Sequence, residues 1–384
     1  MNNYPSLSKS PLIAIAIMIK NEEESIRSTL YSMFKSGIRD FFVLDTGSTD
    51  NTVGIVQTFF KQYPVNGYVN QEAFIDFSTS RNRTLELAEQ YFPTIPFLLM
   101  PDAEWYLHNA LALHIFCEKE KQSQCPLYSI VLKTNETEFT TPRLFRSASR
   151  IRFKGLVHEI PHSFIQKGVP RTVYFQLNPT PKSIEKSRLR WQNDLIILTK
   201  KYHENPQDSR NTFYLAQTYA CLNDMENAYR FYQYREKLDG WDEETFVTLV
   251  CLGQLAMQVN SPDKNLQWAI AMDYFLKAFA LRPHRIEPLL QIADYYWPDN
   301  IPTCYLFASE AYDKPFPAQD QHFIDKVAYQ YTRYEIMSRC AWHMGEFALG
   351  EKATLLALNA RPGTEHLLNN LNLYQEKLAF VHNE

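Results

Sequence analysis

The sequence predicts an α/β domain with a mostly parallel sheet over residues 1–180, followed by an all-helical domain over residues 181–384. Three observations support this fold class. The 384 residues exceed what one hydrophobic core usually organises. Short apolar runs alternate with helical patterns in the first half, whereas long amphipathic helices fill the second half. The pattern changes at the segment Asn178-Pro179-Thr180-Pro181, so we place the domain boundary there.

The first half begins with a predicted strand that is buried on both faces. Residues 12–19 read LIAIAIMI, a continuous apolar run typical of a parallel sheet. Asn21 is predicted to cap the following helix, because the acidic residues 22–24 would then occupy its first turn. Further strands and helices are expected at 41–44, 53–59, 79–90, 97–100, 128–132, 141–145 and 171–175. The β-α-β-α order requires parallel pairing with right-handed crossovers.

The second half contains internal repeats of about 34 residues. Small and aromatic residues recur at matching positions of successive helix-turn-helix units, which resemble tetratricopeptide repeats. Small residues let paired helices approach and aromatic residues fill the space between them, so packing alone explains the pattern. Such stacks also form concave surfaces, which leaves peptide binding and oligomerisation through the repeats open. The clearest positions are Leu215, Ala216, Ala228, Leu252, Gly253, Ala271, Phe275, Ala341, Gly350 and Ala357.

Composition restricts the partners of the chain. The formal net charge of −4 gives no broad cationic field for nucleic acid or for an anionic membrane. The apolar run 11–19 is too short to span a bilayer, and residues 1–10 lack the basic flank and cleavage pattern of a signal peptide. We therefore expect a cytoplasmic protein. The six cysteines form no CxxC pair, which favours reduced thiols.

Acidic residues follow two of the predicted buried strands. Asp45 comes directly after the run 41–44, and Asp102 and Glu104 follow the run 97–100. Open α/β sheets place their ligand crevice at the carboxyl ends of the strands. The sequence therefore predicts a functional site at this edge of the sheet.

Five blocks of the first 180 residues resemble family 2 glycosyltransferases with the GT-A fold. The resemblance implies an inverting, metal-dependent enzyme that moves a sugar from a nucleotide sugar, with UDP as the expected nucleotide. The blocks are IAIMIKNEE at 15–23, LDTGSTDNT at 44–52, DFSTSRN at 76–82, DAE at 102–104, and PRLFR at 142–146 together with IRFKGLVHE at 151–159.

The resemblance also implies a donor site. Asp45 can accept a hydrogen bond from the uracil imide, although an Asp-Thr-Gly-Ser segment also serves as a simple turn or helix cap. Arg81 can bind the base or a phosphate through bidentate or stacked contacts. The expected donor-binding residues are Lys20, Asn21, Glu22, Asp45, Gly47, Arg81, Asp102 and Ala103.

A divalent cation is expected beside the donor diphosphate. Asp102 and Glu104 flank one small residue, so both carboxylates can turn toward one Mn²⁺ or Mg²⁺ ion. Ordinary surface acids are the alternative interpretation. Glu104 stands where the family carries a second aspartate, which lengthens that ligand by one methylene. By resemblance, His158 is the third metal ligand, since a neutral imidazole suits Mn²⁺.

The expected general base is Glu159, Glu138 or Glu136, because a carboxylate must take the proton of the acceptor. The repeats favour a protein or peptide acceptor, and a glycan or lipid-linked acceptor remains open. The alternative function is a noncatalytic, repeat-based adaptor with a degenerate transferase domain. A nucleotidyltransferase is disfavoured, because residues 12–24 are acidic and contain no glycine for a phosphate loop.

Overall fold

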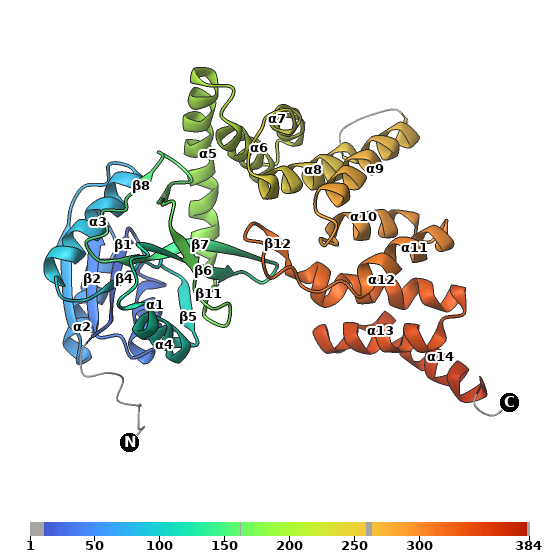
Figure 1. The fold of residues 1–384 in the computed structure, drawn as a ribbon, viewed down its shortest axis with the longest axis horizontal. Coiled ribbons are helices and arrows are strands. Elements are labelled where there is room, and N and C mark those ends of the chain that lie inside the picture. Colours follow the sequence, from blue (N-terminus) through green and yellow to red (C-terminus); the bar gives the residue numbers. More distant parts are fainter. Residues whose placement is uncertain (1–10, 162, 259–262, 382–384) are drawn as a thin grey trace. The chain divides into compact units, whose positions relative to one another are not determined.

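The computed structural model describes residues 11–161, 163–258 and 263–381. Residues 1–10, on which the expectation about a signal peptide rests, lie outside the described residues. The chain forms two compact units (Figure 1). The first contains the chain up to Thr134 and the segment Phe139–Ile197, and the second contains Asn135–Glu138 and the chain from Leu198 onward.

A mixed sheet organises the first unit, and one half of it is parallel. β1 (Ile13–Ile19) lies between β2 (Asp40–Asp45) and β4 (Phe97–Leu99) and runs parallel to both. β3 (Asn66–Gln71) extends the parallel order at the edge. Because β1 has a strand on each side and helices over both faces, every position along it is buried or nearly so. This environment explains its unbroken apolar sequence.

Antiparallel pairs enter in the other half of the sheet. β7 (Thr137–Arg146) pairs antiparallel with β4, and β5 (Trp105–His108) pairs antiparallel with β11 (Tyr174–Leu177). β6 (Leu127–Lys133) runs parallel to β11 and to the short β10 (Gln166–Gly168). The strand order along the main path is β3-β2-β1-β4-β7-β6-β11-β5. The predicted α/β fold class is confirmed, with a sheet that is parallel around β1 and mixed beyond β4.

Helices cover both faces of this sheet. Alternate residues of β1 pack in two different cores: Ile15 and Ile17 share one with α1, α2 and α4, whereas Ala16 shares the other with α3. Successive side chains of a strand point to opposite faces, so one apolar run supplies both cores. The helices are α1 (Ile26–Lys35), α2 (Thr52–Gln62), α3 (Phe77–Tyr91) and α4 (Ala110–Glu120), and β8 (Phe153–Lys154) pairs with β9 (Ile160–Pro161) in a separate small sheet.

The prediction that Asn21 caps the first helix is wrong. α1 begins at Ile26 and Ser25 occupies its N-cap position. Asn21 adopts a left-handed conformation with φ of 56°, and its Oδ1 accepts a hydrogen bond from the backbone N–H of Thr49 at 2.7 Å. Its side chain therefore holds the loop after β2 and cannot cap a helix that starts five residues later.

The helix α5 (Pro181–Glu204) begins where the sequence pattern changes. The division between the two units falls inside this helix, after Ile197. Residues 181–197 therefore belong to the first unit, although the sequence pattern placed the boundary at residue 180.

The second unit is a stack of helices in which consecutive helices pack together. A Cβ on Gly253 would lie 2.4 Å from the ring of Phe275, and one on Gly350 would lie 2.1 Å from the ring of Tyr374. The helices thus approach closely at the small positions, which confirms the helical-repeat prediction. They are α6 (Ser209–Cys221), α7 (Met225–Glu236), α8 (Asp242–Ala256), α9 (Lys264–Leu281), α10 (Glu287–Tyr296), α11 (Ile301–Tyr312), the π-helical turn η1 (Ala328–Thr332), α12 (Arg333–Cys340), the 3₁₀ turn η2 (Ala341–Met344), α13 (Phe347–Ala360) and α14 (Glu365–Val381).

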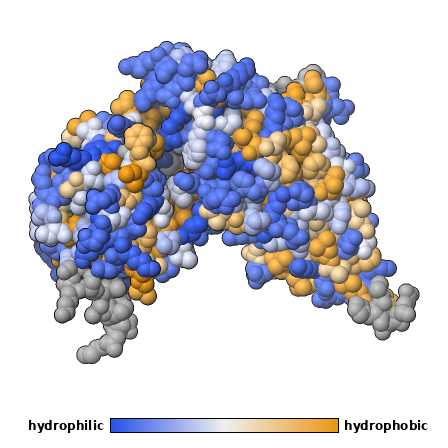
Figure 2. Space-filling view, viewed as in Figure 1, coloured by the Kyte–Doolittle hydropathy of each residue, from blue (hydrophilic) through white to orange (hydrophobic). Residues whose placement is uncertain are grey.

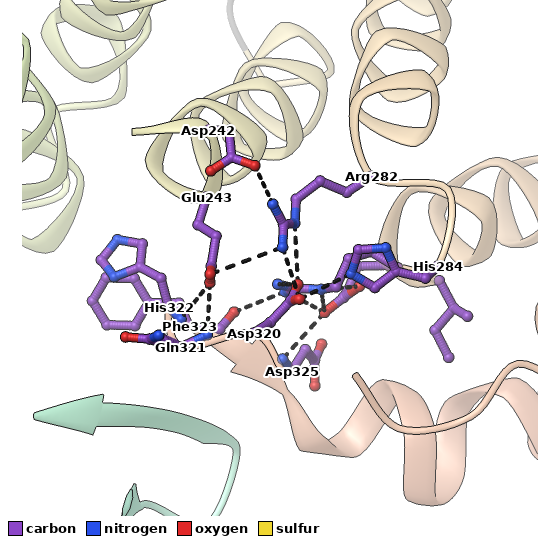
Figure 3. A network of polar contacts seen from close by, with 12 residues as sticks. Asp242, Glu243, Arg282, His284, Asp320, Gln321, His322, Phe323 and Asp325 are labelled. Carbon is purple, nitrogen blue, oxygen red and sulfur yellow. Dashed lines mark hydrogen bonds and ion pairs between the residues drawn. The ribbon is translucent and has the colours of Figure 1, made fainter. Parts of the chain in front are cut away.

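A buried polar network holds the segment between α11 and α12 (Figure 3). Asp320 is fully buried and accepts hydrogen bonds from Arg282 at 2.7 Å, His284 at 2.9 Å and Arg285 at 3.2 Å. The backbone N–H groups of the next two residues donate to Glu243 of α8, each at 2.7 Å. This network fixes the start of β12 (Ile324–Asp325), which pairs antiparallel with the first residues of β7 within the second unit.

The surface carries both polar and apolar side chains. On the face drawn in Figure 2, apolar side chains gather over parts of the helical unit between hydrophilic ones. Among the residues that the structure describes, none of the helices combines the length and the apolar character needed to cross a membrane.

Candidate functional site

Asp102 lies beyond the carboxyl end of β4 and binds two arginines from different elements. Its Oδ1 accepts a hydrogen bond from Arg81 Nη1 at 2.6 Å, and its Oδ2 accepts one from Arg143 Nη2 at 3.0 Å. Burial raises the pKa of Asp102, but the charges of Arg143 and Arg81 outweigh this effect and lower the pKa to about 2. The network brings together three of the sequence blocks, from α3, β7 and the segment after β4.

Arg81 also binds Glu159. Its Nε donates to Glu159 Oε1 at 2.6 Å, and only 6% of Arg81 is exposed. The start of α3 sets this position, because Asp76 caps the helix by accepting from the backbone N–H of Thr79 at 2.7 Å. The neighbouring Asn82 exchanges two hydrogen bonds with the backbone of Phe153, at 2.7 and 3.0 Å. These contacts hold the segment that leads to Glu159 against α3.

The loop that carries His158 and Glu159 has an unusual backbone. Gly155 has φ of +107° and His158 has φ of 48°, so both lie in the left-handed region. The Ser78 hydroxyl donates to the carbonyl of Gly155 and ties the loop to α3. A non-glycine residue in this region at a binding edge indicates a loop whose shape is imposed by its surroundings.

The loops after β1 and β2 are joined at the same edge of the sheet. Ile19 and Asp45 are register partners in the parallel pair, so Lys20 to Glu22 lie beside the turn that contains Gly47. The backbone N–H of Asn21 donates to Ser48 Oγ at 2.8 Å. The structure thus brings the five predicted donor residues of these two loops together.

The Asp45 carboxylate is fully buried and bonded within the protein. It accepts from the backbone N–H of Ser48 at 3.2 Å and from Gln71 Nε2 at 3.1 Å. Gly47 has φ of +97°, which a side chain would strain. Asp45 therefore shapes the turn that it begins, as in the alternative interpretation of the sequence, and its role in donor binding stays a prediction. Lys20 Nζ lies 5.8 Å from the ring centroid of Phe74, an aromatic residue that the sequence did not single out.

The predicted metal ligands Asp102 and Glu104 are bonded to different parts of the protein. Glu104 has φ of 69°, and its Oε1 accepts a hydrogen bond from the backbone N–H of Thr180 at 2.7 Å. Both oxygens of Asp102 are bound by arginines. Within residues 11–161, 163–258 and 263–381, no group of three His, Cys, Asp or Glu side chains is placed to hold a metal ion. The shared ion at Asp102, Glu104 and His158 therefore stays a prediction.

The three predicted base candidates fall in different places. Glu159 lies in the Arg81 network of the first unit. Glu136 and Glu138 belong to the second unit, where Glu138 is the register partner of Ile324 in β12. The sequence could not show that Glu138 belongs to the second unit, because its pairing partner β12 is only two residues long and gives no periodic pattern.

Sequence reasoning missed the contribution of α5. Lys182 Nζ lies 3.0 Å from Glu23 Oε1, and Lys186 binds both the carbonyl of Asn21 and, at 3.3 Å, the carboxylate of Glu22. The first turns of α5 therefore pack on the loop after β1. The signal was available as charged residues recurring at intervals of four along one helix.

A comparison of the sequence with known protein families finds a match in the first unit. Residues 14–99 match the family described as glycosyl transferase family 2. The matched segment spans the parallel strands β1 to β4, and Asp45 and Asp102 lie at the carboxyl ends of two of these strands.

Two curated relatives share this region. The chain is 28% identical over 222 residues to the SPbeta prophage-derived glycosyltransferase SunS of Bacillus subtilis (strain 168). The glycosyltransferase SunS of Bacillus phage SPbeta matches with the same values. The alignments cover 52% of this chain and 48% of each relative, so the chain spans about half the length of the curated relatives it matches.

Solved structures resemble the chain only weakly. S. aureus TarS 1–349 in complex with UDP-GlcNAc is 12% identical with a TM-score of 0.33, covering 96% of this chain and 91% of that one. YrrB, a TPR protein with an unusual peptide-binding site, is 14% identical with a TM-score of 0.36, covering 47% and 84%. Similarities of this size carry no inference about the site.

Proposed function

We propose that this protein transfers a sugar from a nucleotide sugar to an acceptor and inverts the configuration of the anomeric carbon. The observation that carries the proposal is the Arg81–Asp102 ion pair, in which Arg81 is buried and Asp102 partly exposed, at the strand edge of a domain that matches glycosyl transferase family 2. Ligands of open α/β sheets bind at this edge. Guanidinium groups supply charge-assisted hydrogen bonds that suit phosphate oxygens.

Arg143 supports binding of the diphosphate. Its Nη2 binds Asp102, while its Nε and Nη1 are buried and have no hydrogen-bond partner among the described residues. Burial and the neighbouring Arg81 charge lower the pKa of Arg143 to about 10, so it remains a cation at neutral pH. Two guanidinium groups held side by side can stabilise the negative charge that develops on a leaving diphosphate.

In the proposed reaction the acceptor heteroatom attacks the anomeric carbon on the side opposite the diphosphate. The bond from that carbon to the phosphate oxygen breaks, and its electron pair leaves with the nucleoside diphosphate. A carboxylate at the site takes the acceptor proton. The loops of Lys20 and Asp45 are proposed to hold the nucleoside, with UDP expected from the family resemblance. Mn²⁺ or Mg²⁺ would neutralise diphosphate charge when bound.

The acceptor is proposed to be a protein or peptide presented by the helical repeats, because stacked helix pairs offer a concave surface. A glycan or lipid-linked acceptor and oligomerisation through the repeats are alternatives. The alternative function is a noncatalytic adaptor that binds a partner through its repeats and carries a degenerate transferase domain.

Nucleoside diphosphate release by the purified full chain separates these functions. We expect release above a protein-free blank with at least one nucleotide sugar, together with thermal stabilisation by UDP. A ligand at 100 times its dissociation constant stabilises by about 2.7 kcal/mol. Arg81→Gln should abolish release, whereas Arg83→Gln on the exposed side of the same helix should retain it. The proposal would be overturned if the protein neither bound any nucleotide sugar nor released nucleoside diphosphate from one.

A further inference from the structure

The loop between β3 and α3 carries an aromatic side chain at the strand-end edge of the first unit. Phe74 lies between Gln71, the last residue of β3, and Phe77, the first residue of α3. β3 runs parallel to β2, so this loop leaves the sheet at the same edge as the turn that begins with Asp45. Phe74 is 37% exposed. Singly exposed apolar side chains are common on protein surfaces, so the neighbours of Phe74 decide whether it has a function.

Phe74 contacts the loop after β1. Lys20 Nζ lies over the Phe74 ring, 5.8 Å from the ring centroid. In such a contact the cation lies on the side of the ring face. β2 lies between β1 and β3 in the sheet, so a contact between these two loops has to cross the end of β2, where Asp45 is the last residue. One face of the Phe74 ring is therefore turned toward the edge at which Asp45 begins its turn.

Hydrogen bonds hold the backbone on both sides of Phe74. The backbone N–H of Glu72 donates to the carbonyl of Asp45 at 3.0 Å, and the Glu72 carboxylate accepts from Arg83 Nε of α3 at 3.1 Å. On the other side of Phe74, Asp76 caps the start of α3 through its side chain. A loop held in this way places its aromatic side chain before a ligand binds, which lowers the entropic cost of binding.

A second aromatic residue connects Phe74 to the arginine network. The rings of Phe74 and Phe77 have centroids 5.2 Å apart and planes inclined at 74°. Phe77 begins α3, and Arg81 follows one turn later on the same side of the helix. Arg81 binds Asp102 and belongs to the charged pair proposed to bind the diphosphate. A chain of contacts thus joins the loop proposed for the nucleoside, through the two phenylalanines, to the helical turn that carries Arg81.

We propose that the Phe74 ring stacks on the base of the donor nucleotide. This inference rests on the proposed function. A nucleobase has two flat faces that hydrogen bonds to its edges leave uncovered, and an aromatic ring stacks on such a face whichever base is present. The long, flexible stem of Lys20 lets its ammonium group leave the ring face as the base arrives. Phe74 binds the donor in this way and takes no part in bond breaking.

The test measures, by calorimetry, binding of whichever of UDP, TDP, CDP and GDP the wild-type full chain binds most tightly. We expect Phe74→Ala to raise the dissociation constant by about 5- to 150-fold, the usual effect of removing an aromatic side chain from a stacked base. Phe74→Leu keeps the apolar bulk without the flat ring and should lose most of the same affinity. Phe74→Trp should bind at least as tightly as wild type, because it retains a flat aromatic face.

Tyr31→Ala is the matched control. Tyr31 is 38% exposed, has Lys35 Nζ over its ring at 5.3 Å and packs against Phe34 and Tyr63. It therefore resembles Phe74 in exposure and in the lysine over its ring, but it lies on α1 among aromatic residues outside the proposed site. Tyr31→Ala should bind the nucleotide as wild type does.

Fluorescence distinguishes stacking from a structural effect. In Phe74→Trp, nucleotide binding should change the emission of the added indole. Tyr31→Trp has the same number of tryptophans and should respond only as much as wild type does. Affinity within about twofold of wild type in Phe74→Ala, wild-type affinity in Phe74→Leu, or an added indole that does not respond would each overturn the role of Phe74. A wild-type protein that binds none of these nucleotides and releases none from a nucleotide sugar would instead overturn the proposed function itself.

Discussion

Arg81 donates from Nε to Oε1 of Glu159 at 2.6 Å and so joins two residues 78 positions apart in the chain. The same guanidinium binds Asp102, which comes from a third segment. Burial lowers the pKa of Arg81, but the charges of Asp102 and Glu159 outweigh it and raise the pKa above its ordinary value. Arg81 is therefore a permanent cation that fixes the loop of Glu159 against α3.

The first prediction concerns acid stability. The pKa of Asp102 is lowered in the folded state, so its ionised form adds stability above its unfolded pKa of about 3.9. That contribution is lost as the pH falls from about 4 through 2. Asp102→Asn should therefore make the melting temperature less dependent on pH in this range. Glu86→Gln, whose side chain is 51% exposed, is the control, and an equal slope in both variants would contradict the role of Asp102.

The second prediction concerns the nucleoside end of the site. Asp45→Ala should weaken UDP binding by about 1.5 to 3 kcal/mol, the scale of a hydrogen bond that involves a charged group. Asp40→Ala is the matched control, because Asp40 is also buried but lies at the opposite end of β2, where it accepts from Asn66 at 3.1 Å. Calorimetry with UDP measures both. A folded Asp45→Ala variant with wild-type affinity would remove Asp45 from the donor site.

The third prediction concerns the metal. Glu104→Asp restores the usual aspartate of the family motif and shortens the reach of the side chain, and Glu104→Ala removes the carboxylate altogether. If Asp102, Glu104 and His158 converge on one ion in the donor complex, the Glu104→Asp variant should keep substantial Mn²⁺-dependent donor turnover. The Glu104→Ala variant should lose this turnover. Wild-type turnover that a chelator leaves unchanged would argue against a metal requirement. Equal turnover in the Glu104→Ala variant and the wild type would show that Glu104 is not a metal ligand.

Much of the first unit could be predicted because its strands carry a strong local signal. The run over Ile13–Ile19 is apolar at every position, and such a run requires a strand covered on both faces. The motif blocks also predicted Arg81, Asp102 and Glu159 as residues of one functional site, and the structure joins them in one network of ion pairs. Residues at the ends of parallel strands share an edge whatever the details of packing.

The remaining features depend on contacts that local sequence does not encode. Asn21 and the acids after it fit an N-cap, but the bond to Thr49 across two loops decides its conformation. The two-residue β12 is too short for any periodicity. Lys186 lies on a helix that the sequence assigned to the second domain, so its contact with Asn21 and Glu22 required knowledge of how α5 packs.

The fourth prediction concerns the polar network of the helical unit. Asp320 is fully buried, and removing it leaves Arg285 buried with fewer partners, so Asp320→Ala should destabilise the unit by about 3 to 5 kcal/mol. Asp294→Ala should cost at most about 1 kcal/mol, because Asp294 is 64% exposed in its pair with Arg339. Urea unfolding followed by circular dichroism measures both. Similar values for the two variants would show that the network adds little stability.

The last prediction concerns the docking of α5 on the first unit. Lys186 contacts the carbonyl of Asn21 and the Glu22 carboxylate, and both side chains of this ion pair are partly buried. Lys186→Met keeps the aliphatic stem but removes these contacts, which we expect to weaken the docking of residues 181–197 by about 1 kcal/mol. The undocked population should then rise about fivefold, and hydrogen exchange in this segment and cleavage near Asn178 to Pro181 should accelerate accordingly. Lys200→Met on the same helix is the control, since Lys200 is 79% exposed and lies 4.0 Å from Glu204. Equal exchange and cleavage rates in the two variants would show that these contacts do not hold α5 on the loop after β1.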